Sequence, residues 1–300
     1  MAVEVSGDRV IQVRGDDADV FSAGFNCPKG IALGELHHDP SRLRVPLVRR
    51  DGELREATWD EAFDLIRAGL SSIVHESGPD AVAVYLGNPN VHNASSTYFL
   101  PAVVRALGTA YRFSASTVDQ MPKQVASALV FGTELSVPVP DIDRTDLFVV
   151  LGANPLVSNG SLMTAPDMPG RLRALRQRGG RLIVIDPVRT RTARAADVHL
   201  RIRPGTDAVL LAAIVRLLLA GETDLGAAAP YVASDDTAAV RDAVAVFTPE
   251  AAAAVTGIEA AAIVSLVQEI ADATSAAVYG RMGTTTAAWW PSAGEPMACA

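Results

Sequence analysis

Three short polar motifs in the second half of the chain carry groups that suit a nucleotide. They are Gly152-Ala-Asn-Pro155, Asp186-Pro187 and Pro204-Gly-Thr-Asp207. A glycine turn before a helix offers backbone N–H groups to phosphate oxygens, and the Asn154 amide suits sugar or phosphate oxygens. The carboxylates of Asp186 and Asp207 accept hydrogen bonds from a base or a ribose hydroxyl, and Arg189 and Thr190 follow within reach of a phosphate.

Each motif also has a purely structural interpretation. Asn-Pro and Asp-Pro are common turns after a strand, and Thr206 or Asp207 can cap the helix that follows. The chain contains neither a GxGxxG nor a Walker A motif. The residues alone therefore predict a nucleotide-binding α/β domain and no particular reaction.

Strands and helices alternate around these motifs and decide where the motifs lie. Apolar runs predict strands over residues 147–151, 182–185, 197–203 and 276–279. Apolar stripes predict helices over residues 170–178, 209–219 and 258–273,. Such alternation is typical of a parallel sheet with helices on both faces, in which ligands bind beyond the carboxyl ends of the strands.

The first half of the chain has a simpler pattern. Two short alternating segments around Gly7-Asp8 predict a hairpin, and the polar residues 37–54 are expected to form a linker. Thr58 and Glu61 make a capping-box pattern at the start of the first clear helix,. A further strand is predicted over residues 81–86, and helices over residues 96–107 and 123–131.

The composition excludes several classes of protein. Of the residues, 49% are apolar and 20% charged, which is a normal globular balance,. The net charge of -8 argues against a nucleic-acid binder, and no run of eighteen apolar residues predicts a membrane span,. The N-terminus lacks the pattern of a secretory signal, and two distant cysteines, Cys27 and Cys299, fit a reducing cytoplasm,.

Seven motifs, in order, resemble the molybdopterin-guanine-dinucleotide oxidoreductases, the family of formate dehydrogenases and nitrate reductases. They are Gly24–Gly30, Asp39–Leu43 with Pro46-Leu47, Thr58–Ala62, Leu151–Pro155, Ile185–Pro187 with Arg189-Thr190, Arg203–Asp207 and Gly280–Gly283. The resemblance covers roughly residues 1–285. It implies a molybdopterin guanine dinucleotide with molybdenum, or tungsten in its place, and electron transfer to or from a small substrate. It also implies these cofactor-binding residues: Lys29, Gly152, Asn154, Asp186, Arg189, Thr190, Gly205, Asp207, Gly280, Arg281 and Gly283.

The same resemblance bears on the metals. Cys27 matches the last of four cysteines that hold a [4Fe–4S] cluster in the family, and the other three would precede Met1. A cubane normally needs four thiolates, so the alternative for Cys27 is a lone buried thiol. Lys29 matches the lysine between the cluster and the pterin, which places it among the expected catalytic residues.

The expected molybdenum ligand lies in the stretch 114–123, which contains no cysteine. Asp119 is the best oxygen ligand there, with Ser114, Ser116 and Thr117 behind it; the alternative is that Thr117 or Asp119 merely caps a helix. The histidine that follows the ligand in formate dehydrogenases is replaced by Pro122 or a neighbour, a departure from formate chemistry. The remaining candidates, interpreted as solvated or loop histidines, are His37, His38 and His92.

The expected fold class is α/β, with a small N-terminal β and loop segment and two domains with mostly parallel, doubly wound sheets. By resemblance, residues 1–50 are a remnant of an iron–sulfur domain with a linker, residues 51–135 an incomplete first α/β domain, and residues 136–300 a Rossmann-like nucleotide-binding domain. The C-terminal barrel domain is expected to be absent.

Three functions stay open. One is a cytoplasmic molybdenum oxidoreductase with a partner subunit for electron transfer. The others are a non-catalytic nucleotide-binding or structural module, and an inactive truncated product.

Overall fold

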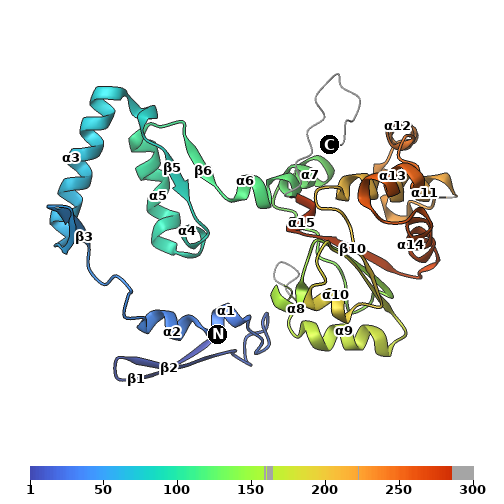
Figure 1. The fold of residues 1–300 in the computed structure, drawn as a ribbon, viewed down its shortest axis with the longest axis horizontal. Helices are drawn as coiled ribbons and strands as arrows, with labels where there is room; N and C mark the ends of the chain where they lie inside the picture. The colour runs from blue at the N-terminus through green and yellow to red at the C-terminus, as the bar shows by residue number, and fades with distance from the viewer. Residues whose placement is uncertain (159, 161–164, 222, 286–300) are drawn as a thin grey trace. The chain divides into compact units, whose positions relative to one another are not determined.

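The computed structural model describes residues 1–158, 160, 165–221 and 223–285 (Figure 1). The chain divides into two compact units made of interleaved segments. The larger unit contains Met1–Ala2, Arg14–Ile31 and the chain from Lys123 onward; the smaller contains Val3–Val13 and Ala32–Pro122. The domain limits expected at residues 50 and 135 stay a prediction.

The larger unit is built on a four-stranded parallel sheet. Its strands are β7 (Leu147–Leu151), β8 (Arg181–Ile185), β9 (Val198–Leu200) and β10 (Ala276–Gly280), in the spatial order β10-β7-β8-β9. The chain runs outward from β7 to β9, and β10 then returns to the other side of β7. The strand order therefore reverses between β7 and β10, the kind of switch point at which parallel sheets bind ligands.

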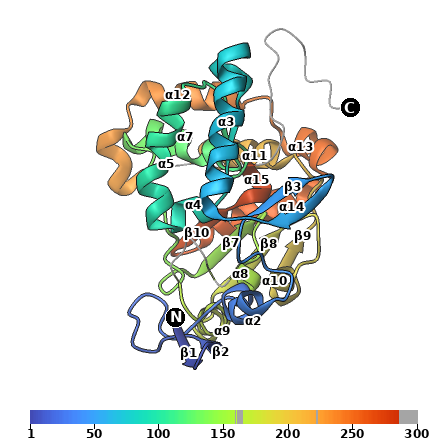
Figure 2. The same cartoon turned by 90° about the vertical axis from the view of Figure 1, so that its left-hand side faces the viewer.

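Helices cover both faces of this sheet (Figures 1 and 2). One face packs against α11 (Asp207–Ala220), α13 (Pro249–Thr256) and α14 (Ala260–Asp272), and the other against α9 (Met168–Gln177) and α10 (Arg191–Ala195). Successive side chains of a strand point to opposite faces, so Val149 enters the first core and Phe148 the second,. Both are almost fully buried, as an apolar run in a covered strand requires,. The predicted α/β fold with a parallel sheet is confirmed.

Shorter elements complete the larger unit. They are α1 (Pro28–Ile31), α7 (Met121–Phe131), α8 (Pro155–Ser158), η2 (Gly226–Tyr231), α12 (Ser234–Val244) and α15 (Met282–Thr285). No single helix among the described residues is long and apolar enough to cross a membrane. The helices α13 and α14 meet that test only as a pair bent by 115°, and their apolar residues lie in the core of the unit.

The smaller unit contains three two-stranded sheets and several helices. The sheets are β1 (Ala2–Ser6) with β2 (Arg9–Arg14), β3 (Leu47–Arg50) with β4 (Glu53–Glu56), and β5 (Val84–Leu86) with β6 (Arg112–Ser114). The helices are α2 (Leu33–His38), α3 (Trp59–Ser77), η1 (Pro79–Ala81), α4 (Pro89–His92), α5 (Ala94–Leu107) and α6 (Ser116–Asp119). The first hairpin turns at Gly7-Asp8 as predicted, and the Thr58 Oγ1 accepts a hydrogen bond from the Glu61 N–H at 3.2 Å, which confirms the helix start.

One expectation for the smaller unit is wrong. The expected linker over residues 37–54 contains the end of α2 and most of the antiparallel pair β3–β4. Its turn is Asp51-Gly52, with φ of 52° and 84°, the dipeptide and the conformation that a tight hairpin favours,. The histidines His37 and His92 are exposed, as expected for solvated side chains, although they lie at the ends of α2 and α4. His38, at the end of α2, is partly buried, and its Nε2 accepts a hydrogen bond from the Val10 N–H at 2.8 Å.

Candidate functional site

Two buried carboxylates lie at the carboxyl ends of β8 and β9. Asp186 is 8% exposed and Asp207, the first residue of α11, is 4% exposed. Burial raises the pKa of Asp207, and the neighbouring charge of Asp186 raises it further. The two carboxylates therefore act on each other electrostatically, and both are acceptors for N–H hydrogen bonds,.

The surroundings of Asp186 and Asp207 fix the pair in place. The Asp186 Oδ1 accepts a hydrogen bond from the Val188 N–H at 2.8 Å, and the Nε2 of His199 donates to the Asp186 carbonyl oxygen at 2.9 Å. The side chain of Thr206 does not cap α11; its hydroxyl donates to the Arg203 carbonyl oxygen at 2.7 Å. Thr206 is thus the N-cap residue of α11 by position but makes no side-chain cap. The contact between His199 and Asp186 could not be predicted from the sequence.

Asn154 has a structural role in addition to the predicted one. Its Oδ1 accepts hydrogen bonds from the Thr192 hydroxyl at 2.6 Å and from the Thr192 N–H at 3.3 Å. Its carbonyl oxygen accepts from the N–H groups of Val157 and Ser158 in α8. The oxygen end of the amide therefore holds β7 to α10, and the Nδ2 is the end that suits a ligand oxygen.

At the switch point, the loops after β7 and β10 come into backbone contact. The Gly283 N–H donates to the Gly152 carbonyl oxygen at 3.1 Å. A Cβ atom on Gly152 would lie 2.5 Å from the Gly283 Cα, and the φ of Gly152 is +55°. Both glycines are therefore required by the close packing of the two loops.

Lys123, in the first turn of α7, is a residue that sequence reasoning missed. Its Nζ donates to the Gly280 carbonyl oxygen at 2.8 Å and lies 5.5 Å from the centre of the Tyr279 ring. Burial lowers the pKa of Lys123, and the positive charge of Arg281 lowers it further. The predicted residues Gly280 and Arg281 thus have a second cation beside them, contributed by a distant part of the chain.

The remaining predicted cofactor residues of the larger unit are less enclosed. Arg189 is exposed. The Thr190 Oγ1 accepts from the Ala193 N–H at 3.0 Å, so Thr190 is the N-cap of α10. Gly205 has a φ of +81° and open space where a Cβ would lie.

Asp119 is the last residue of α6, in the smaller unit, and its Oδ1 is buried. The N-cap residue of α6 is Ala115. The alternative that Thr117 or Asp119 caps the helix expected over residues 123–131 stays a prediction. The other residues predicted near the metal make local hydrogen bonds. The Ser114 Oγ accepts from the Ser116 N–H at 3.3 Å, and the Ser116 Oγ accepts from the Gln120 Nε2 at 3.0 Å.

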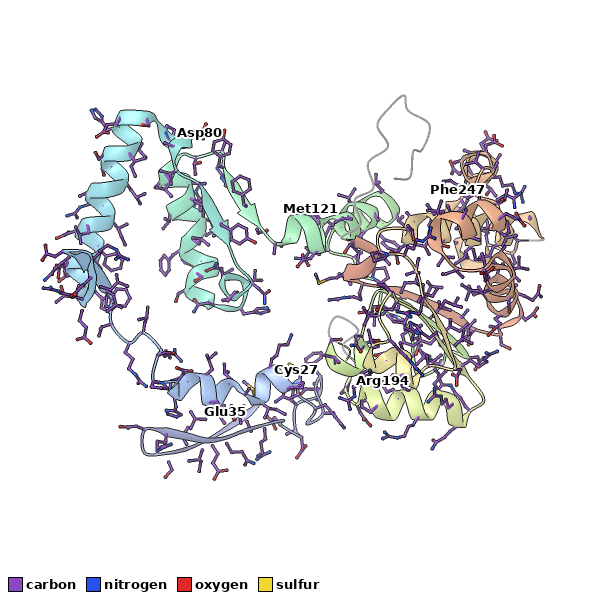
Figure 3. All side chains as sticks on the ribbon, viewed as in Figure 1. Cys27, Glu35, Asp80, Met121, Arg194 and Phe247 are labelled. Carbon is purple, nitrogen blue, oxygen red and sulfur yellow. The ribbon has the colours of Figure 1, made fainter. Side chains whose placement is uncertain are left out.

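Cys27 lies directly before α1 (Figure 3), and its side chain is partly buried. Lys29, in α1, is exposed. Within the described ranges, no three His, Cys, Asp or Glu side chains are grouped to hold a metal ion, and Cys27 is the one cysteine. These residues do not fit a [4Fe–4S] cluster, which needs four thiolates. Cys299 lies outside the described residues.

A family model described as "Molybdopterin oxidoreductase" matches residues 42–224. The chain belongs to the molybdopterin oxidoreductase family. Among curated proteins, a nitrate reductase of Symbiobacterium thermophilum is 30% identical over 228 residues, which are 72% of this chain and 28% of that protein. Formate dehydrogenase H of Escherichia coli is 31% identical over 272 residues, which are 87% of this chain and 37% of that protein. The molybdopterin oxidoreductase chain thus spans about a third of the length of these relatives.

A solved structure shares the fold of this molybdopterin oxidoreductase chain. The acetylene hydratase from Pelobacter acetylenicus matches 86% of the chain, and the match is 35% of that protein. The TM-score is 0.66 and the sequence identity 21%. The likeness extends the fold beyond residues 42–224 and carries no information about substrate.

Proposed function

We propose that the larger unit binds the guanine dinucleotide part of a molybdopterin cofactor, and that the chain is part of a molybdenum- or tungsten-dependent oxidoreductase. One observation carries the proposal: the buried pair Asp186 and Asp207 at the carboxyl ends of β8 and β9, in a sheet of this family. Guanine presents N–H groups on one edge, and buried carboxylates are the acceptors that match them.

The other groups fit the rest of a dinucleotide. The Nδ2 of Asn154 is a donor for a ribose or phosphate oxygen, and Gly152 and Gly283 let the two loops at the switch point approach each other closely. Gly205 gives the turn before α11 a conformation that favours glycine,. When bound, the cofactor supplies the redox chemistry, and the protein supplies binding and electrostatics.

Residues outside this sheet would serve the pterin and the metal. We assign Asp119 as the metal ligand, because its Oδ1 is buried and carboxylate oxygen suits a hard metal ion,. Lys29 would contact the pterin, and Arg189 and Thr190 a phosphate. The substrate would be a small molecule and the electrons would pass to or from a partner subunit. The cytoplasm is the proposed location, in keeping with only two cysteines in the chain,.

A second candidate function is a nucleotide-binding module without catalysis. It is favoured by the composition of the larger unit's site, where Asn154, Asp186 and Asp207 would bind a nucleotide without the help of a metal. Such a module would bind a guanine nucleotide and hold no molybdenum or tungsten.

One analysis of the purified chain separates the two functions. The chain is expressed in cells that make molybdopterin cofactor, and guanine nucleotide, molybdenum, tungsten and iron are measured per chain. Guanine nucleotide together with molybdenum or tungsten supports the oxidoreductase. Guanine nucleotide alone supports the module, and a chain without guanine nucleotide contradicts both.

A further inference from the structure

Two cations meet at the switch point of the sheet, at the carboxyl end of β10. The Lys123 Nζ is anchored to the Gly280 carbonyl oxygen at 2.8 Å, and Arg281 follows in the next position of the chain. A lysine ammonium has three N–H donors. One is used by Gly280, so two can serve a further acceptor.

Arg281 also has N–H groups that can donate to a further acceptor. Its Nη1 is buried and has no hydrogen-bond partner among the described residues. A hydrogen bond from Arg281 to the Tyr279 side chain lowers the pKa of the phenol, which burial raises. The guanidinium is thus held in place at one side while a donor stays unused, and unused buried donors are costly unless a ligand receives them.

The local charge also favours an anion. The described residues contain no ion pair that involves Lys123 or Arg281. The positive charge of Arg281 lowers the pKa of Lys123, so the two like charges act on each other. A bound anion would relieve that repulsion and receive the unused N–H groups.

We propose that Lys123 and Arg281 form a binding site for a phosphate or pyrophosphate group, opposite the backbones of Gly152 and Gly283. The inference rests on the proposed function in naming a dinucleotide as the source of this group. It also gives the dinucleotide an orientation. The base lies toward β8 and β9, where Asp186 and Asp207 are acceptors, and the phosphates lie toward β10. The carboxylates on one side of β7 and the cations on the other match the two ends of such a ligand.

The lysine content of the chain offers a direct test. Lys29 and Lys123 are its two lysines. The purified chain is labelled with an amine-specific reagent, with and without inorganic pyrophosphate in a metal-free buffer, and the labelling rate of each lysine is measured by mass spectrometry. Pyrophosphate is expected to slow labelling of Lys123 several-fold and to leave Lys29, the internal reference, unchanged. Equal rates at Lys123 with saturating pyrophosphate would overturn the site.

Variants measure the contribution of each cation. Lys123→Met and Arg281→Met should each weaken pyrophosphate binding by about tenfold or more, the usual loss for a charge-assisted contact. Lys123→Arg should retain most of the binding. The control is Arg173→Met, which replaces an exposed arginine on α9 outside the proposed site. This variant should bind pyrophosphate as tightly as the unchanged chain. Unchanged affinity in both Met variants would contradict the proposal.

Binding of GDP distinguishes this inference from the proposed function. If GDP binds and pyrophosphate leaves Lys123 unprotected, the phosphate site is wrong and the nucleotide site stands. If pyrophosphate protects Lys123 and GDP does not bind, the phosphate site is supported and the guanine assignment is overturned. If neither ligand binds, both are overturned.

Discussion

A bound ligand would account for the burial of the Asp207 carboxylate. An ionised carboxylate that is 4% exposed and lies near a second carboxylate is unfavourable in the free protein,. Its side chain accepts a hydrogen bond from its own backbone N–H in the first turn of α11, which offsets part of this cost. A donor-rich ligand would satisfy both carboxylates, and in this respect the pair differs from the surface ion pairs of the chain.

Asp207→Asn should make the free protein more stable at neutral pH and the nucleotide-bound state weaker. Because burial raises the pKa of Asp207, its contribution to the free energy of unfolding is largest below the ordinary pKa and is lost as the pH rises through the raised value,. The neutral amide removes this loss. Thermal unfolding between pH 4 and 8 measures it; a lower melting temperature at pH 7 would contradict it.

Lys123 should titrate below the ordinary lysine value of about 10.4. Burial and the charge of Arg281 both lower its pKa, so the reactive neutral amine forms at a lower pH. The rate of amine labelling at Lys123 against pH gives its midpoint. Removing the neighbouring charge in Arg281→Met should raise this midpoint, and an unchanged profile would show that the two cations do not interact.

At the scale of elements, the loops after β7 and β10 pack against each other at Gly152 and Gly283. Gly152→Ala forces a Cβ against the Gly283 Cα and strains a φ of +55°. We expect a loss of about 1–3 kcal/mol in the free energy of unfolding, measured by urea titration. Gly69→Ala in α3, where a Cβ meets open space, is the control and should be neutral or stabilising,. Equal effects of the two substitutions would refute the close-packing argument.

Particular elements show which parts of the fold could be predicted from the sequence. The strand Leu147–Leu151 was predictable because an unbroken apolar run of this length is typical of a strand in a sheet that helices cover on both faces,. The pair β3–β4 was missed because its charged residues outweighed the Asp51-Gly52 turn signal. Lys123 was missed for another reason: its hydrogen bond to Gly280 spans 157 positions, and only the folded sheet brings the two together.

For the whole molecule, the family assignment and the geometry support the same fold. The family model covers residues 42–224, and the acetylene hydratase likeness, with a TM-score of 0.66, covers 86% of the chain. The family indicates which cofactor to test for, and the Asp186–Asp207 and Lys123–Arg281 pairs follow strands on opposite sides of β7. Both pairs belong to the larger unit, so the nucleotide site can be tested in the chain itself.

Titration of the 300-residue chain with GDP, and with ADP as the matched control, tests the nucleotide site most directly. Calorimetry should detect GDP binding that is at least about tenfold tighter than ADP binding, because the adenine edge lacks the donor pattern that two carboxylates accept. Asp207→Asn should remove most of that preference. Equal binding of the two nucleotides, or a preference for GDP that persists without the Asp207 carboxylate, would contradict the account.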